Sequence, residues 1–502
     1  MRTLLALLIG GSAIFTSSCG DGPCDMGGSC WVMSQNGLTV QMRGTPEFTD
    51  DDRDVKSLSP GGVVRIQEGN WMSPERAYEV RADWSGHLTR TYEVDGNPKQ
   101  MNAASQAWVA GAMLYLIRES GIGAANRVQR ILRSGGPNAV LQEVADINSD
   151  GSKKTYLEEL VEHGRLNEDQ LRDALRSARK ISSDGDKCQF LIDVADQCLR
   201  PNLREAWFTV ASTISSDGDR RRALENALRL DSGNGETAQL AAKAAGGISS
   251  DGDKSQVLVE VAEDYKPEAR QAWFRAANTI SSDGDRAHAL TSLLRAANGD
   301  PDTMVEFFDC AKAISSDGDK ARVLSDAAQY SMKTPAVQHA FFAAVNSISS
   351  DGDRGATLSA VLRGADRNGT LLAGVAESAS HISSDGDKAA LLSHLAEAPV
   401  DEPTLRDSFF AAVNTISSDG DRASVLSRVI RQPSASADMV VAAIQSATSI
   451  SSDGDKATVL VLAADTHAGN AAVKAALQKA LESVHSDGDY RRVSSALLRK
   501  TS

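Results

Sequence analysis

The stretch Ile314-Ser315-Ser316-Asp317-Gly318-Asp319-Lys320 recurs with little change along most of this chain. The apolar residue that opens the turn is found at Ile147, Ile181, Ile214, Ile248, Ile280, Ile314, Ile348, Ile382, Ile416, Ile450 and Val484. Most steps between these markers are 34 residues long, and none is shorter than 32. A fixed period of this length indicates a repeat architecture, in which each unit packs mainly against its neighbours.

Each repeat has the pattern of two helices. The turn is followed by two apolar pairs at helical spacing, which indicate a first helix. A loop, such as the one near Pro335, separates this helix from a second helical stretch. One hairpin of this size cannot bury its apolar side alone, whereas stacked hairpins can. We therefore predict a mostly α fold for residues 99–502, an α-solenoid of about eleven 34-residue helical hairpins, similar in architecture to HEAT and TPR repeats.

The residues before the repeats have a different composition. β-branched and aromatic residues are frequent at 63–66, 77–81 and 87–94, and glycine-containing pairs separate these stretches. This pattern predicts a small antiparallel β head over residues 55–98. Residues 20–54 are rich in Gly, Asp, Ser and Thr, and are predicted to form a flexible tether.

Residues 1–19 have the layout of a bacterial export signal. Arg2 precedes an apolar run that ends at Phe15, and small residues stand directly before Cys19. This resembles a lipobox, which implies that Cys19 is lipidated and becomes the first residue of the mature chain. Because Thr16 replaces the leucine usual at that place, cleavage without lipidation is the alternative. We expect an exported lipoprotein, anchored in a bacterial membrane and facing the periplasm or the cell surface.

Two further cysteines lie close to this signal. Cys24 and Cys30 can form a disulfide in the oxidising environment that an exported protein meets. Two free thiols in a linker are the alternative.

The repeated turn has the residues of a helix cap. A serine followed three residues later by an acid is the capping-box arrangement, in which the serine accepts from an orphan amide and the acid reaches back to the amide of the serine. We predict this structural role for the following residues: Ser183, Asp186, Ser216, Asp219, Ser250, Asp253, Ser282, Asp285, Ser316, Asp319, Ser350, Asp353, Ser384, Asp387, Ser418, Asp421, Ser452 and Asp455.

Calcium binding is the alternative role of the turn. Its candidate ligands are carboxylates such as Asp184, Asp186, Asp317 and Asp319. Calcium loops of the EF-hand type offer four or more spaced oxygen ligands, whereas each turn here offers two carboxylates followed by a cation. We therefore favour capping and predict neither a metal nor another cofactor.

Composition and motifs disfavour several functional classes. The net charge of −14 argues against a nucleic-acid partner, which needs a basic surface. The sequence has no HExxH pair for zinc, no GxSxG nucleophile elbow and no Walker loop. We do not expect an enzyme.

A resemblance covers about residues 50–500. The stretch Leu58-Ser59-Pro60-Gly61-Gly62, the element from Arg130 to Leu141 and the Ser-Asp-x-Asp-Lys/Arg turns are similar to those of a group of bacterial α-solenoid repeat proteins. That group has an aromatic residue where this chain has Gly in the turn. It is related to the repeat regions attached to some membrane metallopeptidases of the beta-lactam-sensor type, whose peptidase part is not present here. The resemblance implies a fold and no activity.

These observations favour a non-enzymatic, extracytoplasmic scaffold that binds protein or peptide along the solenoid. Two alternatives remain open at this point. One is a calcium-binding structural or surface protein, and the other is a sensor or regulatory partner of a membrane peptidase.

Overall fold

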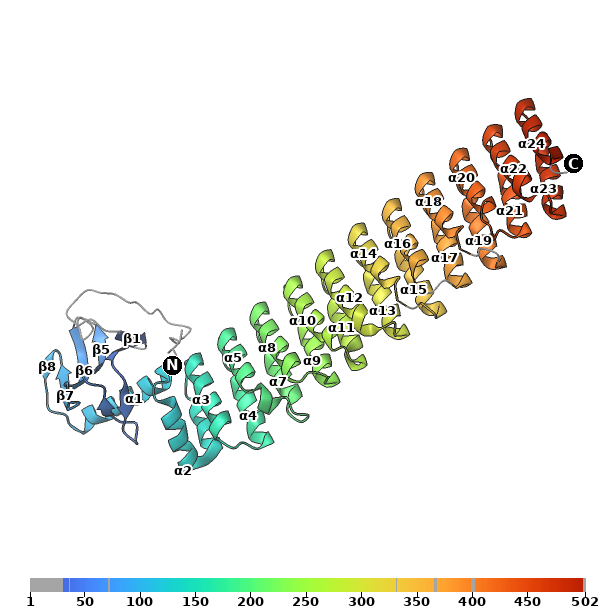
Figure 1. Ribbon diagram of the computed structural model, residues 1–502. Helices are drawn as coiled ribbons and strands as arrows, with labels where there is room; N and C mark the ends of the chain where they lie inside the picture. Colours follow the sequence, from blue (N-terminus) through green and yellow to red (C-terminus); the bar gives the residue numbers. More distant parts are fainter. Residues whose placement is uncertain are drawn as a thin grey trace. The chain divides into compact units, whose positions relative to one another are not determined.

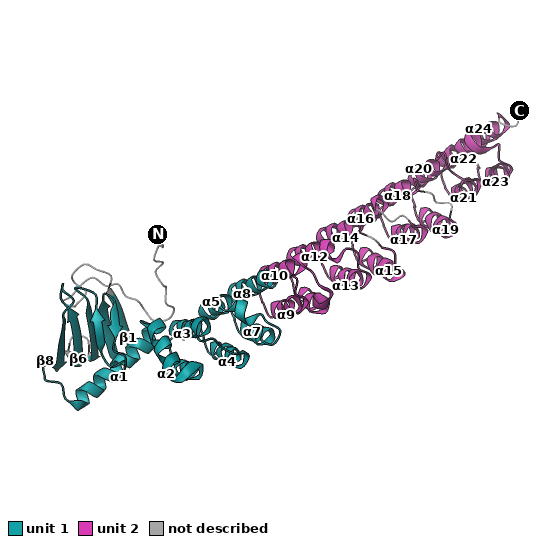
Figure 2. Ribbon diagram, turned by 60° about the horizontal axis from the view of Figure 1, so that its bottom comes forward, with its two compact units in different colours: residues 1–232 teal, residues 233–502 magenta. Residues whose placement is uncertain are grey.

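The computed structural model describes residues 30–35, 37–70, 73–330, 332–364, 368–398 and 402–499. The chain divides into two compact units, residues 1–232 and 233–502, which Figure 2 colours separately. The predicted signal at 1–19, with Cys19, and the predicted disulfide partner Cys24 lie outside the described residues. None of the helices in the described ranges is long and apolar enough to cross a membrane.

Unit 1 begins with an antiparallel sheet. Its strands are arranged in the order β1-β2-β5-β6-β7-β8, and β3 and β4 form a separate two-stranded hairpin. The strand bounds are β1 Cys30–Gln35, β2 Leu38–Arg43, β3 Pro46–Phe48, β4 Val55–Leu58, β5 Val63–Asn70, β6 Ser73–Ala82, β7 Leu88–Val94 and β8 Asn97–Pro98.

One face of this sheet is apolar and is covered by helix α1, Ala103–Ser120. In the register, Val40 pairs with Ile66, and Ile66 pairs with Tyr78, so alternate residues of three strands share one face. Met113 and Leu116 of α1 are fully buried and belong to the same core. The first helix is therefore part of the β head and not a solenoid helix.

The predicted boundaries of the head are wrong on both sides. The predicted tether at 20–54 contains β1, β2 and β3, and the head core extends to α1, beyond the predicted limit at 98. The polar composition of 20–54 was misleading because the buried Val40 and Met42 stand among polar residues, of which Gln41 is buried with them. The Asp-rich stretch is the loop that follows β3, at residues 50–54.

The remaining helices of unit 1 form the first hairpins. In this unit α3 contacts α5 and α5 contacts α8 in one layer, while α2 contacts α4 and α4 contacts α7 in the other. The bounds are α2 Ala124–Ala145, α3 Asp150–His163, α4 Glu168–Ala178, α5 Asp184–Asp193, α6 Ala195–Cys198, α7 Arg204–Ala211 and α8 Asp217–Leu230.

Unit 2 continues the pattern with two layers of helices, and the predicted helical repeat fold is confirmed. Even-numbered helices from α10 to α24 contact one another in one layer, and odd-numbered helices from α9 to α23 form the other, as Figure 1 shows for this unit. The bounds are α9 Gly235–Ala245, α10 Asp251–Glu263, η1 Pro267–Ala269, α11 Arg270–Ala277, α12 Asp283–Ala297, α13 Pro301–Lys312, α14 Asp317–Ala327, α15 Pro335–Val345, α16 Asp351–Arg363, α17 Gly369–Ala379, α18 Asp385–Leu395, α19 Pro403–Val413, α20 Asp419–Ile430, α21 Ala437–Ala447, α22 Asp453–His467, α23 Ala471–Leu481 and α24 Asp487–Arg499.

We call the helix that follows the repeated turn the A helix of a repeat, and the helix that ends before the next turn the B helix. Aromatic residues of the B helices fill the space between the layers. Trp207 and Trp273 are fully buried, and their indole N–H groups donate to Leu191 O at 3.0 Å and Leu258 O at 2.9 Å on the preceding A helices. These bonds satisfy the only polar atom of each indole inside an apolar layer.

Glycines of the Leu58–Gly62 stretch are required by close packing. Gly61 has a φ of +72°, and a Cβ on Gly62 would lie 2.7 Å from the carbonyl oxygen of Ser59 and 3.0 Å from that of Arg43. Backbone atoms cannot move aside as a flexible side chain can. By contrast, Gly185 of the repeated turn is the second residue of α5, and a Cβ there would meet no atom within 4 Å.

We predict opposite outcomes for alanine at these two glycines. Gly62→Ala is expected to lower the free energy of unfolding by about 1–3 kcal/mol because the backbone must shift. Gly185→Ala is expected to leave it unchanged or raise it by up to about 1 kcal/mol, because alanine favours a helix. Urea denaturation of the full chain measures both, and equal effects would contradict this explanation of the Gly-Gly stretch.

Candidate functional site

The serines of the repeated turn cap the A helices, as predicted. Ser183 and Ser316 have extended backbone conformations, and the hydroxyl oxygen of each accepts from the amide of the residue three positions later at 3.3 Å. The same bond is present in the other predicted turns, at Ser216, Ser250, Ser282, Ser350, Ser384, Ser418 and Ser452. The serine half of the capping box is thus confirmed.

The acidic half of the predicted capping box is wrong. The amides of Ser349 and Ser350 donate to Asp317 Oδ2 at 3.0 and 2.8 Å, so their acceptor comes from the preceding repeat and not from Asp353. Asp is one methylene shorter than the Glu or Gln of a true capping box, and the serine amide already has this partner. The first aspartate of a turn therefore joins two repeats. The carboxylates that act in this way are Asp150, Asp184, Asp251, Asp283, Asp317, Asp351, Asp385, Asp419 and Asp453.

At the first turn, a residue of the β head takes over this task. The amides of Asn148 and Ser149 donate to Glu119 Oε1 and Oε2 at 3.1 and 3.0 Å, and Glu119 lies at the end of α1. The head thus presents to the first repeat the same kind of acceptor that the aspartates named above present to the repeats after them.

The cation that ends the turn is buried, which the sequence analysis did not predict. Lys187, Lys254, Lys320, Lys388 and Lys456 are each only 4% exposed. Lys320 Nζ donates to Ser347 O at 3.2 Å, and Lys388 Nζ donates to Thr415 O at 3.2 Å, so each lysine binds a carbonyl just after the B helix of its own repeat, directly before the next turn. Cations are favoured at that end of a helix because its last carbonyls are unpaired.

Arginine, which alternates with lysine at this position, binds both ends of its own repeat. Arg354 Nε donates to Ile348 O at 3.1 Å within its turn, while Nη1 donates to His381 O at 2.5 Å, after the B helix of the same repeat. Arg422 makes the corresponding pair of bonds with Ile416 O at 3.0 Å and Ser449 Oγ at 2.9 Å. Every full turn retains a lysine or an arginine. This was the signal that could have revealed the structural role, because a cationic residue at an exposed position is easily replaced by another residue.

These bonds give the candidate calcium ligands another role. Asp184 Oδ2 and Asp317 Oδ2 each accept two backbone N–H groups of the next repeat, and Asp319 pairs with Arg322 at 3.0 Å. Asp184 and Asp186 belong to one turn, and Asp317 and Asp319 to another. In the described ranges, no group of three or more His, Cys, Asp or Glu residues is arranged to hold a metal ion.

We predict that the two aspartates of one turn differ in their effect on stability. Asp317→Ala leaves two amides without their acceptor and is expected to lower the free energy of unfolding by about 1–3 kcal/mol. Asp319→Ala removes a favourable charge near the start of α14 and its surface ion pair with Arg322, and about 0.5–1 kcal/mol is expected. Urea denaturation measures the two values. A cost for Asp319→Ala equal to that for Asp317→Ala would contradict the bridging role.

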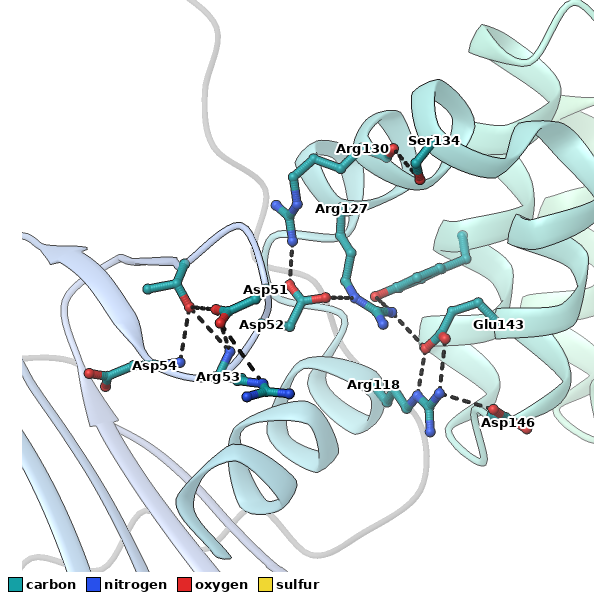
Figure 3. Close-up of polar contacts among 12 residues, drawn as sticks. Asp51, Asp52, Arg53, Asp54, Arg118, Arg127, Arg130, Ser134, Glu143 and Asp146 are labelled. Carbon is teal, nitrogen blue, oxygen red and sulfur yellow. Dashed lines mark hydrogen bonds and ion pairs between the residues drawn. The ribbon is translucent and has the colours of Figure 1, made fainter. Parts of the chain in front are cut away.

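A second cluster of charged residues joins the β head to the first hairpins (Figure 3). Asp52, in the loop between β3 and β4, accepts from Arg127 Nε at 2.7 Å and also pairs with Arg130. Arg127 Nη1 donates in turn to Glu143 Oε1 at 2.6 Å, and the same carboxylate receives Arg118 of α1. Asp52 has a φ of +59°, a conformation that non-glycine residues seldom adopt.

The same loop is also tied to the sheet. Asp54 Oδ1 accepts from Tyr78 Oη at 2.8 Å, and Asp54 Oδ2 accepts from Arg90 Nε at 2.8 Å. Burial and the neighbouring Asp54 charge raise the pKa of Tyr78. Beside the loop lies a cleft of about 230 Å³, with Phe48, Ile117 and Ile122 among its lining residues. Sequence reasoning missed this cluster because its members come from residues 52–143, and no spacing rule joins them.

The electrostatics of this cluster are set by Glu143. Burial opposes ionisation of its carboxyl, but the hydrogen bonds from Arg118 and Arg127 outweigh burial and lower its pKa from 4.5 to about 2. The Glu143 side chain is only 12% exposed, so solvent screens these bonds weakly.

We predict a pH dependence from this shift. Because the pKa of Glu143 is lower in the folded state, its contribution to stability is complete above about pH 4.5 and is lost as the pH falls towards 2. Glu143→Gln is expected to remove about 2–3 kcal/mol at neutral pH and to flatten the fall in stability across that window. Asp146→Asn, which changes an exposed partner of Arg118, is the control. Equal pH profiles for Glu143→Gln and the unchanged chain would refute the assignment.

The described cysteines are unreactive packing residues. Cys188, Cys198 and Cys310 are buried free thiols, and burial raises their pKa values to about 11, 12 and 12. The backbone of Cys30 begins β1, while its side chain and Cys24 lie outside the described part, so their disulfide stays a prediction.

The outward side of the B helices varies from repeat to repeat. The residue five positions before the marker that opens the next turn is exposed in all ten of these repeats except at Ala343, where it is half-buried. We call it the outward position. Its residues are Arg176, Thr209, Lys243, Arg275, Asp309, Ala343, Glu377, Ala411, Gln445 and Lys479.

Comparison with known proteins adds little to this description. No family model matches the chain, and no curated protein matches it. Among solved structures, the crystal structure of the Chs5-Bch1 exomer cargo adaptor complex is similar over 89% of this chain and 85% of that chain, with 9% sequence identity and a TM-score of 0.18. A likeness at that TM-score carries no information about function.

Proposed function

We propose that this chain is a non-enzymatic scaffold that binds protein on the extracytoplasmic side of a bacterial membrane, where a lipid on Cys19 anchors it. The helical repeat fold is compatible with such a role, because stacked hairpins offer an extended surface for a partner. The export and the anchor rest on the signal pattern of residues 1–19.

The proposal rests on one observation: the turn residues that bind within and between repeats are constant, whereas the exposed residues at the outward position vary. The serine, the first aspartate and the cation of the turn are engaged in bonds within or between repeats, for example at Ser316, Asp317 and Lys320. The outward position, in contrast, includes cations, anions, alanine and neutral polar residues. This variety gives the surface positions that differ in charge and polarity, which recognition of a specific partner requires.

The proposal predicts that partner capture depends on the outward positions. We would replace Lys243, Arg275, Asp309, Glu377 and Lys479 by serine in the full chain, and use it to capture proteins from an extracytoplasmic extract. Mass spectrometry is expected to identify a partner that the unchanged chain retains and this variant loses. The two chains should melt at the same temperature, because the five side chains are exposed.

The control variant carries five serines at exposed residues in or directly after the A helices, with the same change in net charge: Arg322, Arg363, Glu397, Arg428 and Asp465. It is expected to keep the partner. The scaffold proposal fails if no captured protein depends on the outward positions. A Cys19→Ser variant tests the anchor separately, since it should move from the membrane fraction to the soluble fraction.

A further inference from the structure

Helix α4 departs from the repeat pattern on its outward side. Nine, five and two positions before the next marker it carries Arg172, Arg176 and Arg179. In the repeats that follow, from residue 205 to residue 482, these three positions never hold more than one lysine or arginine. Spacings of four and three residues place the three guanidinium groups along one face of the helix. A basic stripe is therefore built into one repeat of a chain whose net charge is −14.

The three arginines line a groove. Helices α4 and α7 lie side by side in unit 1 (Figures 1 and 2), and between them is a groove of about 300 Å³ lined by these arginines. Its lining also includes the buried residues Leu175 and Val210. The groove thus combines an apolar part with positive charge along one side. Its acidic lining residue is Glu205 of α7.

The arginines are oriented by weak contacts that a ligand can replace. Arg172 Nη1 donates to Asp169 Oδ1 at 2.7 Å, and Arg172 Nη2 donates to Asn202 O at 3.1 Å, which holds this side chain across the groove. Arg176 pairs with Asp173, and both side chains are more than 40% exposed. Exposed pairs of this kind contribute little, so an incoming carboxylate competes with them easily.

We propose that the α4–α7 groove binds an acidic segment of a protein partner, in which carboxylates flank a short apolar side chain. Guanidinium groups bind carboxylates through two parallel hydrogen bonds, and the apolar residues of the groove accept the side chain between them. A groove of this size suits a short segment. A long polyanion such as nucleic acid or an anionic membrane would also meet the negative charge of the rest of the chain. This inference rests on the proposed scaffold function and names its partner class.

The test uses a defined probe and the full chain. A fluorescein-labelled peptide in which glutamates alternate with leucines is titrated, and fluorescence anisotropy reports binding. A peptide with glutamine in place of every glutamate is the first control. The combined variant Arg172→Gln, Arg176→Gln and Arg179→Gln is expected to bind the acidic peptide at least about tenfold more weakly, because three charge-assisted contacts are lost.

A matched variant tests whether weaker binding comes from the loss of the groove arginines or from the change in net charge. Arg322→Gln, Arg363→Gln and Arg428→Gln remove the same number of positive charges from exposed positions of A helices, outside the outward positions. This variant is expected to bind the acidic peptide as the unchanged chain does. Equal weakening in both variants, or no binding of the peptide by the unchanged chain, would overturn the proposal. Circular dichroism melting verifies that both variants fold.

Two further probes distinguish the partner class. A single-stranded DNA oligonucleotide and vesicles containing phosphatidylglycerol are titrated in the same way. Binding of either probe that is tighter than peptide binding and depends on the three arginines would also refute the assignment to a protein segment. If partner capture through the outward positions succeeds but the arginine variant binds the peptide normally, the scaffold function stands and only the groove assignment fails.

Discussion

Adjacent repeats of this protein depend on one recurring interaction, in which the aspartate that begins an A helix accepts two backbone amides of the next turn. The amides are those of the two serines, and the distances are nearly constant, as at Asp351 with 3.0 and 2.8 Å and at Asp385 with 3.1 and 2.8 Å. An A helix begins at each of these aspartates, so its first turn is held by its own serine while its carboxylate fixes the neighbour. The residues at the start of an A helix therefore both cap that helix and bind the next repeat.

A cation of the turn ties together the two helices of a hairpin. The B helix of the same repeat ends with unpaired carbonyls just before the next turn, and the lysine or arginine binds there. Lys388 binds a carbonyl at the end of its repeat, whereas the branched guanidinium of Arg354 binds such a carbonyl and one of its own turn together. This difference in bonding gives the alternation of lysine and arginine a physical basis. Burying such a charge is tolerated because it is bonded.

Most of the repeat fold could be predicted from the sequence, because a helical hairpin is a local structure. The 34-residue period located the turns, and the serine caps followed from residue type alone. The partners of Asp317 could not be predicted, since a capping box and a bridge to the next repeat use the same residue types. The β head was predicted too short because Val40 and Met42 stand among polar residues, and the cluster of Asp52, Arg127 and Glu143 joins segments that no pattern relates.

The position of Glu119 has a consequence for the length of the array. This glutamate accepts two backbone amides of the first turn, as an aspartate of the preceding repeat does at later turns, for example Asp317 at Ser349 and Ser350. The head therefore offers the first turn the kind of acceptor that one repeat offers the next. Within unit 2, junctions with lysine and with arginine recur in turn, so a pair of repeats could be added or removed there without creating a new type of junction. The length of the array is thus adjustable, while the Glu119 contact at its first turn remains constant.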